Sequence, residues 1–351
     1  MLMNSWIEEI LAPELTAATW QEAVIAATLS DASRAEAFGI TLNNVVEVVT
    51  TRAKLLQAVY PDFCQFCQTN LNLPPQQLWE PLWNLWLPLA IQIASKHQQL
   101  HRPFIQGILG GQGTGKTTLS AMLTLIHKHL GYRTISISLD DLYKTYSDRR
   151  ALQQQDPRLI WRGPPGTHDI HLGLTVLDNL RHSQTSVSIP RFDKSAYNGA
   201  GDRTTPEIVQ GVDIVLFEGW FVGARPVNEV IFESPPLPII TDADKAFARD
   251  MNHQLRDYLP LWERLDSLIV MYLKDYHQSI AWRQQAEQQM IATGKSGMKD
   301  TEIKTFVEYF WRSLHPELFI TPLTKSPLWV DLVVEINTNH TPGAVYRPIH
   351  D

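Results

Sequence analysis

The first 100 residues carry apolar side chains at intervals of three and four, which is the spacing of one helix face. Prolines interrupt this pattern at several points and predict breaks between successive helices. Trp79, Trp83 and Trp86 form an aromatic stripe at the same spacing. Such a stripe is typical of core packing rather than of a ligand site. The pattern therefore predicts an N-terminal helical region over residues 1–100.

The pattern changes at Phe104, where short apolar runs begin to alternate with helical stretches. The runs cover residues 104–109, 134–139, 212–217, 267–273 and 332–336. The first ends in a glycine-rich loop, and the next two end in acidic residues. Strands that alternate with helices build βαβ units and a parallel sheet. The predicted fold is an α/β domain over residues 101–351, with a parallel sheet flanked by helices.

Composition narrows the class of protein. The chain is 44% hydrophobic and 19% charged, as in ordinary globular proteins. A formal net charge of −7 and the lack of a basic stripe argue against a nucleic-acid partner. The most apolar stretch, residues 82–94, contains Pro88 and is too short to cross a bilayer, so no membrane partner is expected. No leader-like pattern opens the chain, which makes the cytoplasm the expected location.

Cys64 and Cys67 are the two cysteines of the chain and form a single C-x-x-C pair. A zinc site would need further ligands, and a thioredoxin-like redox pair would need a βαβ context. Helical spacing places both thiols on one face, where free cysteines usually pack as small apolar side chains. We expect packing, with redox activity as the alternative.

A glycine-rich loop follows the first predicted strand. Its sequence, Gly110-x4-Gly115-Lys116-Thr117, fits the phosphate-binding pattern G-x-x-x-x-G-K-[ST] of P-loop NTPases. The glycines let backbone N–H groups wrap phosphates, and the N-terminus of the next helix attracts their charge. We expect Lys116 to reach the β- and γ-phosphates of ATP and Thr117 to bind Mg²⁺. The predicted nucleotide-binding residues are Gly110, Gly111, Gln112, Gly113, Thr114, Gly115, Lys116, Thr117 and Thr118.

Carboxylates follow two other predicted strands, and ligands of open α/β sheets bind at the carboxyl ends of strands. Asp140 and Asp141 follow the second run, and Glu218 follows the third. The apolar run before Glu218 is typical of a Walker B strand, which predicts a Mg²⁺ ligand. Phosphoryl transfer to a hydroxyl needs a general base, and Asp140 is the predicted base, with Glu218 as the competing choice. A helix cap is the alternative role for Asp141.

Five segments make this pattern more specific. They are ILGGQGTGKTT (108–118), ISLDDLYKT (137–145), WRGPPGTHDIHLG (161–173), IPRFDKSAYNGAGDR (189–203) and VLFEGWFVG (215–223). The first, second and fifth resemble the phosphoribulokinase, uridine kinase and pantothenate kinase superfamily, and the other two resemble the D-glycerate 3-kinases of plants and cyanobacteria. The resemblance runs from about residue 101 to the C-terminus. It implies Mg²⁺- and ATP-dependent phosphorylation of D-glycerate, a photorespiratory setting, Asp140 as base and Glu218 as the second acid.

The two segments that resemble glycerate kinases are rich in charge and read as loops between strand ends. A site for a small acid needs fixed cationic donors and hydrogen bonds to hydroxyls. The predicted substrate residues are Asp141, Tyr143, His168, Asp169, Arg191, Asp193, Lys194 and Arg203, with Arg162 in the same segments. Among them His168, Asp169, Arg191 and Lys194 are favoured. The alternative for each charged residue is an ordinary exposed charge.

Residues 276–300 resemble the lid of these kinases. They combine Trp282-Arg283, a Gln/Glu-rich helical pattern and a Gly- and Lys-containing loop at 293–298. The resemblance places Arg283 at the transferring phosphate, as a catalytic residue. A lid would exclude water from the phosphoryl group. A solvated helix face is the alternative.

Three functions remain open at this point. The first is an ATP:D-glycerate 3-phosphotransferase, and the second is a sibling kinase for uridine, pantothenate or ribulose 5-phosphate. The third is a nucleotide-dependent regulator whose N-terminal region binds a partner. The cationic residues Arg191, Lys194 and Arg203 favour an acid or phosphate over a nucleoside. No pattern in the sequence predicts the adenine contacts or the oligomeric state.

Overall fold

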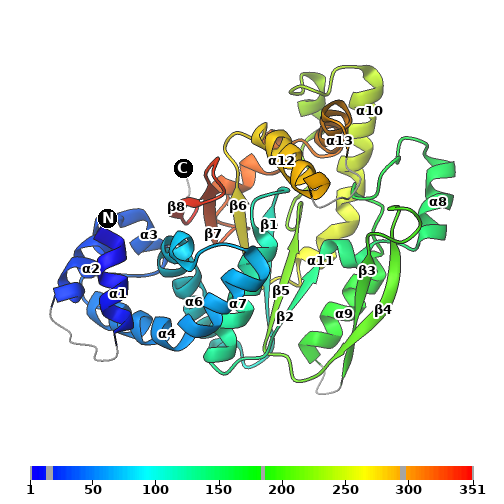
Figure 1. Ribbon diagram of the computed structural model, residues 1–351. Coiled ribbons are helices and arrows are strands. Elements are labelled where there is room, and N and C mark those ends of the chain that lie inside the picture. The colour runs from blue at the N-terminus through cyan, green and yellow to red at the C-terminus, as the bar shows by residue number, and fades with distance from the viewer. Residues whose placement is uncertain (1, 13–18, 183–185, 293–297, 350–351) are drawn as a thin grey trace.

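A six-stranded sheet forms the centre of the protein, whose computed structural model describes residues 2–12, 19–182, 186–292 and 298–349. The strand order is β2-β5-β1-β6-β7-β8, and all neighbours are parallel except the antiparallel pair β7–β8. A separate antiparallel pair joins β3 and β4 (Figure 1). The strands are β1 Phe104–Gly110, β2 Thr134–Ser138, β3 Val187–Asp193, β4 Asp202–Val209, β5 Ile214–Gly219, β6 Ser267–Tyr272, β7 Leu332–Ile336 and β8 Pro342–Tyr346.

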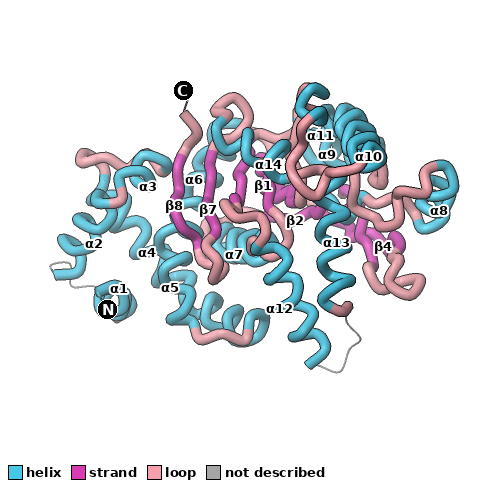
Figure 2. The backbone as a smooth tube through the Cα atoms, turned by 90° about the horizontal axis from the view of Figure 1, so that it is seen from above, coloured by secondary structure: helices cyan, strands magenta, loops and turns pink. Residues whose placement is uncertain are grey.

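Helices precede, connect and cover these strands (Figures 1 and 2). The described helices are α1 Leu2–Leu11, α2 Thr19–Ser30, α3 Ala32–Ala37, α4 Val45–Phe66, α5 Trp79–Pro81, α6 Leu87–Leu100, α7 Lys116–His129, α8 Tyr146–Gln155, α9 Ile170–His182, α10 Asp242–Gln254, α11 Leu259–Trp262, α12 Gln278–Ala292, α13 Asp300–Ser313 and α14 Pro316–Phe319. Among the residues described, no helix is both long and apolar enough to cross a membrane.

The central strand β1 is buried along its whole length because helices cover both faces of the sheet. Successive side chains of a strand point to opposite faces. Phe104 and Ile108 join an apolar core with α7 and the N-terminal helices. Ile105 and Leu109 join a second core with α9, α10 and α11. The predicted α/β fold with a parallel sheet between helices is confirmed.

The N-terminal helices share their core with one face of the sheet. Trp83 of the segment before α6 and Phe63 of α4 belong to the same apolar cluster as Leu123 and Ile126 of α7. The tryptophan stripe is buried in this cluster, as its spacing predicted. Cys67 is also buried there, and Cys64 packs against the cluster half-buried. The region therefore covers the sheet instead of forming a core of its own.

The segment 189–203 differs from its predicted loop, because most of it forms the hairpin β3–β4. Most side chains of β4 are exposed or half-buried. An exposed strand needs no apolar run, so the hydrophobic pattern gives no signal for it. The hairpin is a separate two-stranded sheet that lies beyond β2, the edge strand of the main sheet. Its charged turn lies near the strand ends (Figure 1).

Candidate active site

The glycine-rich loop turns sharply between β1 and α7. Gly113 and Gly115 have φ angles of +83° and +86°, a left-handed conformation that favours glycine. Lys116 folds back over the loop, and its Nζ donates a hydrogen bond to the carbonyl oxygen of Gly111 at 2.9 Å. The Thr114 hydroxyl donates to the same oxygen at 2.8 Å. The first turn of α7 has backbone N–H groups without intrahelical acceptors, which suits a phosphate.

Two carboxylates reach this loop from neighbouring strands. Glu218 is the penultimate residue of β5, which lies between β1 and β2. It pairs in register with Ile108 on one side and Ser138 on the other. Burial raises the pKa of Glu218, against the opposing effect of the Lys116 ammonium. Burial lowers the pKa of Lys116, against the carboxylates of Glu218 and Asp140. Lys116, Glu218 and Asp140 thus form one electrostatically linked group.

Asp140 lies in a short 3₁₀ turn, Leu139–Leu142, directly after β2. Its Oδ2 is 2.6 Å from Nζ of Lys194, which comes from the β3–β4 turn. Burial by itself would raise the pKa of Asp140, but the Lys194 ammonium and the hydrogen-bonding Tyr143 hydroxyl hold this pKa below its ordinary value. Asp140 is therefore an ionised, half-buried carboxylate.

His168 is buried beside Asp140, with 1% of its surface exposed. Its ring stacks on Tyr143 at 4.6 Å between centroids. Burial lowers the pKa of His168 to about 3, so the ring is neutral. The hydroxyl of Tyr258 accepts a hydrogen bond from the Gly166 N–H at 2.9 Å and lies 2.7 Å from Nδ1 of His168.

We assign the tautomer of His168 from this geometry. The Gly166 N–H donates to the Tyr258 oxygen, and we assign the hydroxyl proton of Tyr258 to its short contact with Nδ1, which then acts as the acceptor. The ring proton is left on Nε2, a buried atom with no hydrogen-bond partner in the structure. A buried donor without a partner is costly, and a bound hydroxyl or carboxylate oxygen would satisfy it.

The other predicted substrate residues form ion pairs along the hairpin. Nη1 of Arg191 is 2.9 Å from Asp141, and Nη2 is 2.6 Å from Glu207. Arg203 is 2.8 Å from Asp169 and also donates to the Tyr143 carbonyl oxygen.

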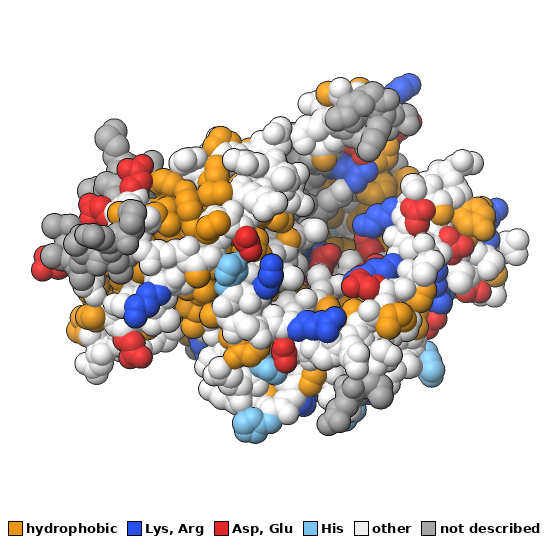
Figure 3. Space-filling model, turned by 60° about the horizontal axis from the view of Figure 1, so that its bottom comes forward, with side chains coloured by type: hydrophobic (Ala, Val, Ile, Leu, Met, Phe, Trp, Pro, Cys, Tyr) orange, Lys and Arg blue, Asp and Glu red, His pale blue; other side chains and the backbone are white. Residues whose placement is uncertain are grey.

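Some of these carboxylates also have local roles. Asp141 accepts from the Ser138 N–H in a capping box, and Asp193 accepts from the backbone and hydroxyl of Ser195. These bonds order the turn after β2 and the turn of the hairpin. Figure 3 shows basic and acidic side chains close together around a hollow in the surface.

Comparison with known proteins places this geometry in a family. No protein-family model matches the chain. A chloroplastic D-glycerate 3-kinase from Arabidopsis thaliana is 30% identical over 307 residues, which are 80% of this chain and 64% of the plant protein. A solved D-glycerate 3-kinase from Cryptococcus neoformans is 28% identical with a TM-score of 0.66, covering 74% of this chain and 96% of that one. The kinase mug58 of Schizosaccharomyces pombe is 32% identical over 60% of this chain and 79% of its own length.

The chain belongs to the P-loop kinase family of D-glycerate 3-kinase. The match spans less than two thirds of the plant relative. In this kinase, the carboxylates Asp140 and Glu218 lie close to Lys116 of the phosphate-binding loop.

The segment predicted as a lid, residues 276–300, contains α12, and α13 begins at its last residue. Arg283 of α12 pairs with Glu287 one turn along the helix and lies 5.2 Å from the Phe306 ring in α13. These two contacts of Arg283 join residues of α12 and α13. Residues 293–297 of the predicted lid lie outside the described residues.

A contact that the sequence did not predict joins α12 to the phosphate-binding loop. A Cβ atom on Gly113 would lie 2.7 Å from the Trp282 ring of α12. The Trp282 ring also stacks on His340 at 4.2 Å, and His340 contacts the Gly113 carbonyl oxygen at 2.9 Å. Tyr258, which orients His168, was missed as well. No sequence motif marks Trp282, His340 or Tyr258, because each of them contacts residues that are distant in the chain.

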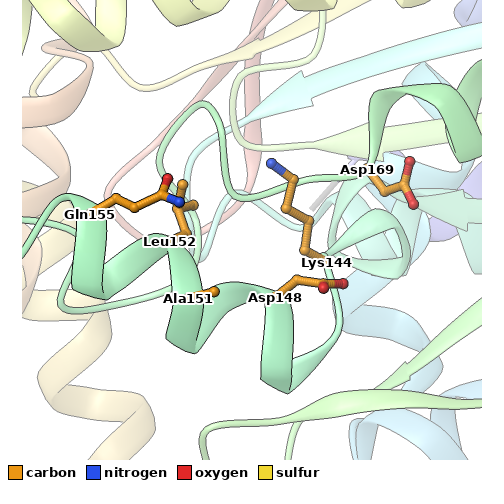
Figure 4. A pocket seen from close by; sticks show the side chains of 6 residues that line it. All are labelled: Lys144, Asp148, Ala151, Leu152, Gln155 and Asp169. Atoms are coloured by element: carbon orange, nitrogen blue, oxygen red, sulfur yellow. The ribbon is translucent and has the colours of Figure 1, made fainter.

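An open cavity of about 390 Å³ lies beside the candidate site, between α8 and the loop that carries Asp169 (Figure 4). Its lining residues are Lys144, Asp148, Ala151, Leu152, Gln155 and Asp169. None of them belongs to the phosphate-binding loop or to the Asp140–Glu218 pair. The predicted site of phosphoryl transfer therefore lies at the strand ends, outside this cavity.

Proposed function

We propose that the protein transfers the γ-phosphoryl group of ATP to D-glycerate and releases ADP and 3-phospho-D-glycerate. The observation that carries this proposal is the ionised Asp140, held by Lys194 and Tyr143 next to Lys116. Asp140 takes the proton of the glycerate hydroxyl while that oxygen attacks the γ-phosphorus and the bond to the β–γ bridging oxygen breaks. Membership of the D-glycerate 3-kinase family supports the choice of acceptor.

The residues around Asp140 suit a small acid. Lys194 offers an ammonium at the turn of the hairpin, and the Nε2–H of His168 offers a neutral donor. A carboxylate and neighbouring hydroxyls match this combination of donors. The same cation disfavours a nucleoside, for which aromatic stacking and neutral donors are expected. Asp140 disfavours a regulator without an acceptor, since such a protein needs no base.

Mg²⁺ fits the residues at the loop. Among the described residues no three His, Cys, Asp or Glu side chains cluster as a metal site, and Mg²⁺ usually takes one or two protein oxygens and completes its shell with phosphates and water. The Thr117 hydroxyl and Glu218 would hold it. The ion would neutralise charge on the phosphates.

Other parts of the proposal rest on the family resemblance and the sequence. Closure of α12 would bring Arg283 to the transferring phosphate. The proposal includes a kinase domain over residues 101–351 that follows a helical region over residues 1–100. It also includes a cytoplasmic location and a photorespiratory setting. No nucleic-acid partner is proposed, because the chain is acidic.

A coupled assay of ADP release across several acceptors tests the proposal. The panel is D-glycerate, L-glycerate, uridine, pantothenate and ribulose 5-phosphate, each at saturating Mg-ATP. We expect the highest kcat/KM with D-glycerate. A higher value with uridine, pantothenate or ribulose 5-phosphate would assign the protein to a sibling activity, and no acceptor-stimulated release would favour the regulator.

A further inference from the structure

Among the described residues, Arg52 of α4 is a buried cation without an ion-pair partner. Only 3% of its surface is exposed. Its guanidinium carbon lies 5.2 Å from the centre of the Trp83 ring, a favourable but neutral contact. Its Nε has no hydrogen-bond partner. Within the described part of the chain, no carboxylate lies within ion-pair distance of Arg52.

A small, partly open cavity lies next to this guanidinium. Its volume is about 30 Å³, a few times the roughly 10–15 Å³ that one water molecule needs. Arg52, Arg34, Asp31, Asn84 and Thr28 supply its polar lining. The cavity lies in the N-terminal helices, and no residue of the phosphate-binding loop lines it.

The charges around the cavity do not balance. Asp31 is already paired with Arg34, at 2.8 Å, and also caps α3 through the Arg34 N–H. Arg34 donates in addition to the Gly343 carbonyl oxygen at 2.8 Å. Asp31 thus pairs with Arg34 and leaves Arg52 without an anion among the described residues. Burial, and secondarily Arg34, lower the pKa of Arg52 to about 10, which still leaves it charged at neutral pH. An uncompensated buried charge is strongly unfavourable.

We infer that this cavity binds one small anion, chloride or a carboxylate group of similar size, against Arg52. The guanidinium supplies the charge and the Asn84 amide supplies a neutral donor in the same cavity. The volume favours chloride or formate over phosphate or sulfate. Bound there, the anion links α4 to α3 and to the segment before α6, and so stabilises the helical region. The site is independent of the proposed kinase reaction.

The experiment measures the thermal unfolding midpoint of the full chain at constant ionic strength while chloride or formate replaces gluconate. We expect a saturable rise in the wild type and none in Arg52→Met. The matched control is Arg225→Met, since Arg225 also lies on a tryptophan, Trp329, and has an unpartnered Nε, but does not line the cavity. Arg225→Met should keep the chloride dependence. The same saturable rise in Arg52→Met, or no saturable rise in the wild type, would overturn the inference.

A second measurement does not depend on the variant folding. Wild-type crystals soaked in bromide, a heavier substitute for chloride, should give an anomalous peak within hydrogen-bond distance of Arg52. Soaking with sulfate in place of bromide should leave this cavity without a tetrahedral anion. A cavity that contains only water after bromide soaking means that Trp83 and solvent satisfy Arg52, and the inference is then wrong.

Discussion

Asp140 combines burial, which destabilises a carboxylate, with two partners that stabilise it. Lys194 and Tyr143 prevail, so the pKa of Asp140 lies below its ordinary value. A general base must be ionised at the working pH and must act on the reacting hydroxyl. Both requirements can be tested separately, one by removing the carboxylate and the other by removing its cation.

Replacing Asp140 by Asn should lower kcat by about 10²- to 10⁴-fold and change the KM for ATP little, because the base acts in the transition state. Glu218→Gln should instead raise the Mg²⁺ concentration needed for activity. Steady-state kinetics of both variants at several Mg²⁺ concentrations measure this. If Asp140→Asn retains most of its kcat while Glu218→Gln loses it without a metal defect, Glu218 is the base.

The pH profile should report on Lys194. Activity is lost as pH falls through the pKa of Asp140, because the protonated carboxyl cannot act as a base. In Lys194→Met the lowering effect of the ammonium is gone while burial remains, so this pKa rises and the acid limb of kcat/KM moves to higher pH. Lys245→Met, which removes a half-buried lysine of α10 whose Nζ donates to the Glu233 carbonyl oxygen, is the control. An acid limb at the same pH in wild type and Lys194→Met would contradict the assigned ion pair.

Tyr258→Phe tests the tautomer of His168. Loss of the hydroxyl removes the donor that holds Nδ1 and leaves the Gly166 N–H unpaired. We expect a loss of about 1–3 kcal/mol in the free energy of unfolding, and a KM for D-glycerate roughly tenfold higher as Nε2 stops being a uniform donor. The KM for ATP should not change. A variant that is merely destabilised, with an unaltered glycerate KM, would limit Tyr258 to a structural role. Tyr272→Phe, whose hydroxyl contacts Thr321, is the control.

At the scale of elements, the contact between α12 and the phosphate-binding loop depends on Gly113. Gly113→Ala adds a left-handed alanine, at about 1–2 kcal/mol, and a clash with the Trp282 ring. Gly131→Ala has nearly the same φ, +84°, but open space around its Cβ. The loss in free energy of unfolding, measured with denaturant, should be larger for Gly113→Ala.

A double-mutant cycle isolates the clash from the backbone strain. In a Trp282→Ala background the ring is gone, and the cost of Gly113→Ala should fall toward that of Gly131→Ala. Equal costs of Gly113→Ala in both backgrounds would mean that α12 does not rest on the loop.

The elements that the sequence predicted are those with a local signal. β1, β5, β6 and β7 are mostly buried runs, and β2 alternates buried and half-buried residues. The alternation of these strands with helices was enough to place Lys116, Asp140 and Glu218 at one edge of the sheet. The hairpin β3–β4 carries exposed polar side chains, and β8 is a short edge strand, so neither has a long apolar run. Trp282, Tyr258 and His340 act through partners distant in the chain, and one sequence carries no pattern for such pairs.

At the scale of the molecule, the N-terminal helices and the sheet depend on one another. Removing residues 1–100 would expose the apolar side of α7, where Leu119, Met122, Leu123 and Ile126 are buried. We expect the fragment 101–351 to be insoluble or to unfold at a much lower temperature than the full chain. Soluble yield and thermal unfolding of both proteins measure this. A stable, active fragment would mean that the helical region is an independent unit.

The position of β1 between β5 and β6 also has a consequence for biosynthesis. β1 is complete at residue 110, but its neighbours end only at residues 219 and 272. At about 5–20 residues per second, the ribosome needs roughly 8 to 30 s to deliver both neighbours after β1. During this interval the N-terminal helices have emerged without the sheet that covers their apolar faces. We expect chaperones to engage the nascent chain in this window, which makes translation the stage at which the protein is most exposed to aggregation.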